Sequence, residues 1–481
     1  MSSYTMQDLE IWDDRIQEKI LAFGLNCFPQ EFEICDHHDM LAYMAYSGMP
    51  SHYPHWSYGK SFEKLKTLYD YGVSGLPYEM VINANPTLAY LMKDNTLLLQ
   101  ILTIAHVYGH NDFFKNNFTF QTTRPEYVLG MFKSHGTRIR KYMEDPQIGI
   151  ERLEPVLDAA HAVSLQCRRN MAIKKLTVEE QQADAIQRAM PPPDPFHKIH
   201  ARQEYVEPDL HKNPLNPEED ILLFIRDNNP FLESWEKDVL TMVHEEAQYF
   251  IPQIETKIMN EGWASYWHKT ILDSLDLPQE LYLEFLVRHN QVIRPHEGSI
   301  NPYHIGFKVW EGIRKRFDDT PQSERAEKLS HPSRTGLEMM FAVRETDRDT
   351  AFLRRHLTNE LIRELDLFQY VPQKDEADFV INRVADEDDE SYRIIRDTLI
   401  ANIGTNSIPV IKVHDADFGG NRTLYLEHEY DGRDLDGEYA KKTLEYLFAL
   451  WRREVALATV VQGKRVLMKC NKDGVSSNTI K

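Results

Sequence analysis

The stretch from Leu97 to His110 limits the folds open to this chain more than any other part of the sequence. It reads Leu-Leu-Leu-Gln-Ile-Leu-Thr-Ile-Ala-His-Val-Tyr-Gly-His and follows three residues suited to helix capping, Asp94-Asn-Thr96. This pattern predicts a helix that is apolar all round, and such a helix must be buried by other elements on every side. We therefore expect a large helical body built around this segment.

The rest of the chain predicts an α+β protein that is mainly helical. Helical spacing extends over residues 8–24, 124–190, 231–248 and 254–276, and residues 79–85 alternate like a short strand that ends at Pro86. Beyond about residue 375 the segments follow the order β-α-β-β-α-β, which is typical of a ferredoxin-like unit. We expect a body over residues 1–370 and a small C-terminal ferredoxin-like α/β domain over residues 375–475. Seven prolines between positions 191 and 217 predict a long irregular excursion within the body.

Charge and cysteine content exclude several classes of function. The chain has 55 Lys and Arg against 75 Asp and Glu, a net charge of −20, which disfavours nucleic acid or an anionic membrane as the main partner. Four cysteines without a CxxC pair argue against a disulfide framework or a thiolate zinc site. No secretory signal is visible, and the longest apolar run, residues 96–105, is too short to span a bilayer. We therefore predict a cytoplasmic protein.

His106 and His110 interrupt the apolar helix. Residues four apart share a helix face, so their rings can bind one metal ion, although each could also be a core histidine with a hydrogen-bonded partner. A second apolar helix, residues 258–268, carries Glu261 and His268 on one face, and its Gly262 permits the close approach of another backbone. Two histidines at this spacing and a glutamate from a later helix form the three-ligand arrangement of catalytic zinc sites. We predict Zn²⁺ or another divalent ion at His106, His110 and Glu261.

The motif departs from His-Glu-x-x-His, because Val107 stands where the glutamate would act as general base. A replacement base could come from the segment Val243-His-Glu-Glu246, with Glu245 or Glu246 as the base and His244 as a further ligand. An exposed charged turn is the competing interpretation of that segment. If His244 or His268 fills the fourth position, the site closes and becomes structural.

The strand over residues 79–85 fits the same interpretation. In zincin-like peptidases an edge strand precedes the histidine helix and pairs with extended substrate, so we predict a zincin-like helical body in which Asn83 and Asn85 lie near the bound substrate.

At these residues the chain resembles the SpoVR family, bacterial proteins named for stage V sporulation protein R. The resemblance covers nearly the whole chain, and its matching stretches are residues 49–60 (MPSHYPHWSYGK), 79–86 (EMVINANP), 106–115 (HVYGHNDFFK), 259–268 (MNEGWASYWH), 301–303 (NPY), 344–347 (RETD) and 352–354 (FLR). The family implies a role in forming the spore cortex, a peptidoglycan layer. In bacteria that do not sporulate it implies a stationary-phase or stress module with a PrkA-type serine protein kinase and a von Willebrand-type protein.

Two functions follow from these observations. The first is a metal-dependent hydrolase or amidase acting on a peptide-like or cell-wall-related substrate. The second is a non-catalytic scaffold or regulator that keeps a degenerate metal site and acts with the kinase and the von Willebrand-type protein. The missing glutamate after His106 favours the scaffold, and the retention of both histidines and of Glu261 favours the hydrolase.

Overall fold

A computed structural model describes residues 4–480 of the chain except 74, 170–173, 191–204, 206, 297–298, 322, 368, 373–378 and 383–388. Most of the predicted proline-rich excursion therefore lies outside the described residues. The chain divides into two compact units, each assembled from separate segments: residues 1–138 with 250–407, and residues 139–249 with 408–481. Two helices, α5 (Val128–Glu144) and α9 (Ser234–Glu255), pass from one unit into the other. No helix in the described part of the chain is long and apolar enough to cross a membrane.

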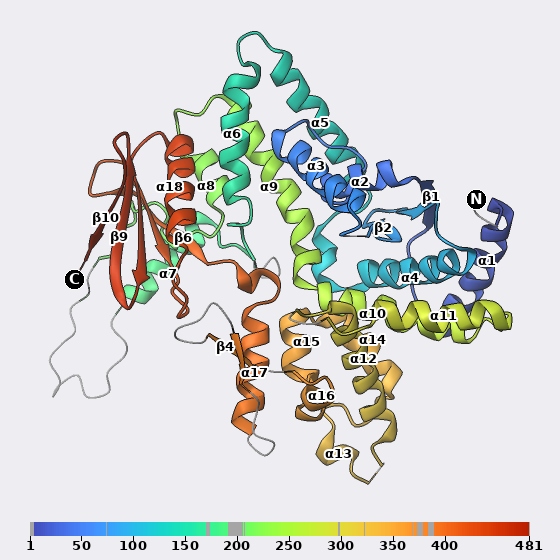
Figure 1. Ribbon diagram of the computed structural model, residues 1–481. Coiled ribbons are helices and arrows are strands. Elements are labelled where there is room, and N and C mark those ends of the chain that lie inside the picture. The colour runs from blue at the N-terminus through green and yellow to red at the C-terminus, as the bar shows by residue number, and fades with distance from the viewer. Residues whose placement is uncertain are drawn as a thin grey trace. The chain divides into compact units, whose positions relative to one another are not determined.

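The first unit is mainly helical (Figure 1). Its helices are α1 (Met6–Phe23), α2 (His37–Ala45), α3 (Trp56–Asp70), α4 (Leu97–Asn116), α10 (Lys257–Asp273), α11 (Gln279–Val292), α12 (Pro302–Asp319), α13 (Arg325–Lys328), α14 (Gly336–Thr346), α15 (Asp349–His356), α16 (Asn359–Glu364) and α17 (Asp389–Ala401). Its strands are β1 (Gln30–Cys35), β2 (Glu79–Ile82), β3 (Thr87–Met92), β4 (Gln369–Pro372) and β5 (Phe379–Asn382). The first three strands form one sheet in the order β1-β3-β2, with β1 parallel and β2 antiparallel to β3.

Helix α4 is the buried centre of this unit, as its composition predicts. Thr96 caps it by accepting a hydrogen bond from the Leu99 amide, and every residue from Leu98 to Phe114 is buried. α4 lies beside α10, and α10 in turn packs on α12 (Figure 1). The predicted strand before α4 forms as β2 and lies at the edge of its sheet. The sequence pattern does not predict β3, which stands between β2 and α4 along the chain.

The second unit contains a five-stranded sheet with α18 (Gly437–Trp451) packed against it (Figure 1). Its other helices are α6 (Gly149–Val163), α7 (Val178–Ala189) and α8 (Ile221–Asn228). Its strands are β6 (Ile411–Phe418), β7 (Thr423–His428), β8 (Val455–Val461), β9 (Lys464–Asn471) and β10 (Gly474–Thr479), in the order β10-β9-β8-β7-β6. All neighbouring strands are antiparallel except β7 and β8, which α18 connects as a crossover.

The predicted ferredoxin-like arrangement is wrong in its first strand. That arrangement needs the strand near residue 380 in the same sheet as β6, but β5 pairs with β4 in a separate two-stranded sheet. The fifth strand of the large sheet is instead β10, at the end of the chain. Strand-like residues indicate that a strand forms, whereas its partner depends on contacts distant in sequence.

The prediction that Gly262 allows a close backbone approach is confirmed. A Cβ atom at Gly262 would lie 2.3 Å from the carbonyl carbon of Gly306 in α12, closer than side chains tolerate. On the neighbouring face, a Cβ atom at Gly109 of α4 would lie 2.6 Å from the Cα of Ala264 in α10. Two glycine contacts thus bring the backbones of α4, α10 and α12 together.

Replacing Gly262 by Ala should destabilise the protein. The added methyl group meets backbone atoms of α12 that cannot rotate away, so we expect a loss of about 1–3 kcal/mol, the usual cost of overpacking a core. Thermal unfolding followed by circular dichroism measures the effect. Gly59→Ala in α3 is the matched control, since a Cβ there meets nothing within 4 Å and alanine has the higher helix propensity. A Gly262→Ala variant as stable as the Gly59→Ala variant would contradict the close contact.

Candidate metal site

The predicted histidine pair and Glu261 come together in the first unit. His106 and His110 are 3% and 7% exposed, and their ring centroids lie 4.6 Å apart on one face of α4. Glu261 reaches them from α10, with its Oε2 atom 3.8 Å from His106 Nε2 and 3.5 Å from His110 Nε2. One ligand atom from each residue lies within 4.8 Å of the others, and no other group of His, Cys, Asp or Glu gathers this way in the described part of the chain.

The spacing of these atoms suits a divalent ion. Bonds of about 2.0–2.1 Å in a tetrahedral site separate the ligand atoms by about 3.3 Å. The observed 3.5 and 3.8 Å need only a small contraction to reach that value. Among the described residues, neither His106 Nε2 nor Glu261 Oε2 has a hydrogen-bond partner, although both atoms are buried. Buried polar atoms seldom stay unsatisfied, and a metal ion would satisfy both.

Glu79 is a further acidic group at this site, and the sequence motifs do not identify it. It lies at the start of β2, and its Oε1 atom is 3.9 Å from His106 Nε2. Burial raises the pKa of Glu79, and the negative charge of Glu261 acts in the same direction. In the sequence, only its position at the start of the strand before the histidine helix points to a role for Glu79. Its proximity to His106 arises only when the chain folds.

The other ring nitrogens of both histidines are also engaged. His110 Nδ1 lies 2.8 Å from the carbonyl oxygen Oδ1 of Asn260, and His106 Nδ1 lies 3.0 Å from Nδ1 of His268. Their Nε2 atoms are therefore the ones that face Glu261. His268, a predicted ligand, contacts Nδ1 of His106, whereas Glu261 faces Nε2 of the same ring.

The electrostatics keep His110 and Glu261 in the protonation states that bind metals. Burial and the neighbouring His106 lower the pKa of His110 to about 4, so its ring is neutral at pH 7. Burial alone would raise the pKa of Glu261, but its side-chain contact with His106 and the neighbouring imidazole of His110 lower it below the usual value. The charge of Glu261 and burial raise the pKa of Tyr303, in α12, well above its ordinary value, so the phenol stays protonated beside the carboxylate.

The other predicted site residues have different surroundings. His244, Glu245 and Glu246 lie on α9 in the second unit, whereas the cluster belongs to the first. His244 Nε2 is 2.6 Å from Oδ2 of Asp220, so its ring already has a carboxylate partner.

The predicted substrate-binding residues follow β2 directly. Asn83 is buried and donates a hydrogen bond of 2.9 Å to Thr123 Oγ1. The Asn85 amide lies 3.5 Å from Glu126 Oε1. Both side chains therefore contact the segment that follows α4, and a role in holding substrate stays a prediction.

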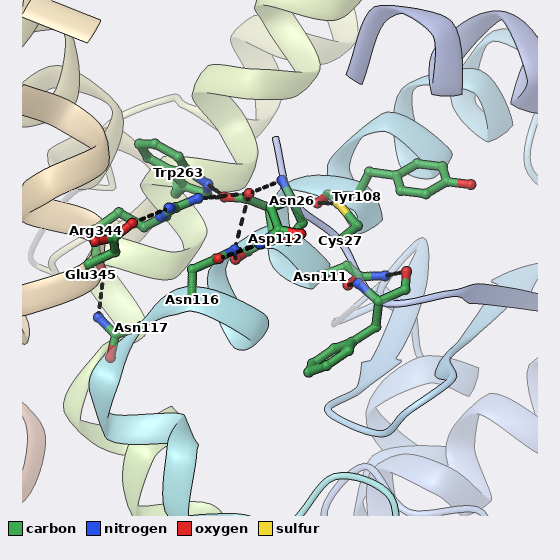
Figure 2. A network of polar contacts seen from close by, with 11 residues as sticks. Asn26, Cys27, Tyr108, Asn111, Asp112, Asn116, Asn117, Trp263, Arg344 and Glu345 are labelled. Atoms are coloured by element: carbon green, nitrogen blue, oxygen red, sulfur yellow. Dashed lines mark hydrogen bonds and ion pairs between the residues drawn. The ribbon is translucent and has the colours of Figure 1, made fainter. Parts of the chain in front are cut away.

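A buried ion pair fixes the helices that carry the site (Figure 2). Asp112, two residues beyond His110, is fully buried, and both its carboxylate oxygens lie 2.7 Å from Nη1 of Arg344 in α14. The indole of Trp263, two residues beyond Glu261, donates to the same carboxylate at 2.9 Å, and the Asn26 amide donates at 2.7 Å. Burial raises the pKa of Asp112 in spite of Arg344. One carboxylate thus connects α4, α10 and α14 next to the site.

Removing the cation of this pair should be costly. We expect Arg344→Met to lose about 3–5 kcal/mol of stability, because it leaves a buried carboxylate without a counter-charge. The double variant Asp112→Asn with Arg344→Met should lose less than the sum of the single variants, since neither unpaired charge remains. Denaturant unfolding of the four proteins measures this coupling.

The control for this cycle is Lys328→Met, which removes an exposed partner of Glu324 and should cost less than about 1 kcal/mol. If Arg344→Met costs no more than Lys328→Met, the buried pair does not hold the helices as described.

Comparisons with known proteins agree with the sequence resemblance. The profile described as SpoVR like protein matches residues 3–408, and the profile described as SpoVR-like C-terminal domain matches residues 409–462. A protein of Escherichia coli (strain K12), described as uncharacterized protein YcgB, is 30% identical over 486 residues, which cover 94% of this chain and 92% of that protein. No solved structure is significantly similar to the chain.

Proposed function

The chain belongs to the SpoVR family, and we propose that it is a metal-dependent hydrolase or amidase whose metal is held by His106, His110 and Glu261. The observation that carries this proposal is the buried cluster of two imidazole nitrogens and one carboxylate oxygen, two of which have no hydrogen-bond partner among the described residues. Two histidines and a glutamate leave a fourth position for water or substrate. Zn²⁺ is the ion that such a ligand set binds most often, although another divalent ion fits the same donors.

A bound divalent ion would polarise a scissile carbonyl group and lower the pKa of a water molecule. Glu79 is then the residue best placed to accept a proton, because its Oε1 atom lies close to His106 Nε2 and burial raises its pKa above the usual value. It would take the role that glutamate has in His-Glu-x-x-His. Tyr303 remains protonated and could donate a hydrogen bond to an oxygen of the substrate.

The class of substrate is proposed from the family and from the edge strand. β2 pairs only with β3 among the described strands, so its second edge could align an extended peptide-like chain beside Glu79. The family's connection with spore cortex or stress physiology suggests a cell-wall precursor or a regulatory protein as the source of that chain. Asn83 and Asn85, at the end of the strand, are the candidates for contacting it.

A scaffold or regulator is the second candidate function. It is favoured by Val107, which takes the place of the usual base and is fully buried. In this case Glu79 would be a fourth ligand that closes a structural site. The PrkA-type kinase and the von Willebrand-type protein are the partners that the family suggests, and binding to either that survives Glu261→Ala would favour this function.

The metal itself is tested first. Elemental analysis of the purified protein should find about one zinc or other divalent ion per chain, and His106→Ala and Glu261→Ala should each lose it, since each removes one of three protein ligands. Wild-type protein that stays metal-free after incubation with zinc, iron and manganese would rule out the proposal.

Glu79→Gln then separates the hydrolase from the closed site. If Glu79 is the base, the variant should keep its metal but hydrolyse substrate about 10²–10⁴-fold more slowly. If Glu79 is a fourth ligand, the variant should bind metal more weakly. Hydrolysis is followed on quenched peptides and muropeptide fragments. Glu245→Gln and Glu246→Gln are the matched controls, and activity that falls in one of these variants but not in Glu79→Gln would assign the base to α9 instead.

A further inference from the structure

Three buried histidines from three helices form a continuous row that ends at the candidate metal site. His106 of α4, His268 of α10 and His289 of α11 are 3%, 0% and 3% exposed. Nδ1 of His106 lies 3.0 Å from Nδ1 of His268, and Nε2 of His268 lies 2.8 Å from Nδ1 of His289. We refer to these three residues as the histidine chain. Three imidazoles at hydrogen-bond distance in a protein interior must share their protons in a definite order.

The hydrogen bonds of the histidine chain can run in only two directions. A neutral imidazole has one N–H donor and one acceptor nitrogen, so each contact needs one proton. If His106 donates from Nδ1, His268 accepts at Nδ1 and donates from Nε2, and His289 accepts at Nδ1. In the opposite direction His289 donates, and the proton of His106 lies on Nε2. Burial favours the neutral rings, because a charged imidazole would lose its hydration in the protein interior.

Only the first direction leaves a lone pair on His106 Nε2, the atom that faces Glu261. A metal ligand must present such a lone pair. We propose that His268 and His289 are positioning residues that hold His106 in the tautomer with its proton on Nδ1, so that Nε2 is ready to bind metal. This inference rests on the proposed metal centre and extends it to two residues that do not contact the ion.

The second histidine of the pair supports the same arrangement independently. His110 Nδ1 lies 2.8 Å from Oδ1 of Asn260, a carbonyl oxygen that can only accept, so its proton is also on Nδ1. Both histidines of α4 therefore have a hydrogen-bond partner at Nδ1, and both direct Nε2 toward Glu261. Such outer partners fix ring orientation in metal sites, and their loss usually weakens metal binding about 10–100-fold.

The position of His289 makes the inference specific. In the proposed direction, Nδ1 of His289 accepts the hydrogen bond from Nε2 of His268. The proposal therefore requires a hydrogen-bond acceptor at position 289 but not an aromatic ring. Glutamine can accept through its side-chain carbonyl oxygen, whereas phenylalanine keeps the ring shape and accepts nothing. Packing alone would favour phenylalanine, and the tautomer role favours glutamine.

The test compares zinc affinity by chelator competition in the full-length chain. We expect His289→Phe and His268→Phe to weaken zinc binding about 10–100-fold, and His289→Gln to retain most of the wild-type affinity. The visible absorption spectrum of the Co²⁺-loaded protein should change in the two phenylalanine variants, because the His106 ring is no longer held. His356→Phe is the matched control, since His356 is an equally buried histidine of α15 outside the histidine chain.

The outcomes separate this inference from the proposed function. Wild-type protein that binds zinc while the phenylalanine variants match His356→Phe in affinity and spectrum would overturn the positioning role and leave the metal centre intact. Wild-type protein that binds no metal overturns both. If His268→Phe fails to fold, the comparison of His289→Phe with His289→Gln decides alone, and glutamine no better than phenylalanine counts against the inference.

Discussion

The backbone contacts made by Gly109 and Gly262 are the constraint on which the first unit depends. They let α4, α10 and α12 approach one another more closely than side chains allow. A Cβ atom added at Gly109 would lie 2.6 Å from a backbone atom of α10, and one added at Gly262 would lie 2.3 Å from a backbone atom of α12. His106 and His110 lie on either side of Gly109 along α4, and Glu261 directly precedes Gly262. A wider helix spacing would separate the imidazole nitrogens from the carboxylate beyond the reach of one ion.

This close packing has an electrostatic cost that the site and its neighbours share. Histidines and carboxylates in a region of Leu, Ile, Phe and Trp lose their hydration, so each needs a partner. Asp112 is satisfied by Arg344, Trp263 and a backbone amide. The outer nitrogens of His106 and His110 are satisfied by His268 and Asn260. Among the described residues, the inner atoms His106 Nε2 and Glu261 Oε2 have no such partner, and one ion bound between them would satisfy both.

The sequence predicts those parts of the fold whose signals are local. Helix α1 ends at Gly24, whose φ of 81° needs glycine, and α4 starts at the expected Thr96 cap. The pairing of His106 with His110 follows from helical periodicity alone. The proximity of Glu261 to both histidines follows from residue chemistry, because an isolated carboxylate in an apolar helix must find a partner.

Features that depend on contacts distant in sequence could not be predicted. The partner of β5, the strand β10 and the neighbourhood of Glu79 to His106 all depend on such contacts. The hydrogen-bond partners of His244 and His268 could not be predicted for the same reason. His244 contacts Asp220, and His268 contacts Nδ1 of His106. No sequence spacing predicts either contact.

The missing glutamate at position 107 follows from how α4 is buried. Val107 is fully buried, so in this fold a carboxylate at that position would be desolvated in the core. An acid that serves His106 must therefore come from another element. Besides the predicted ligand Glu261, the described residues place Glu79, at the edge of the small sheet, within 4 Å of His106 Nε2. Under the proposed function, the base and the histidines would be carried by a strand and a helix, so a search for His-Glu-x-x-His along one helix would overlook such a site.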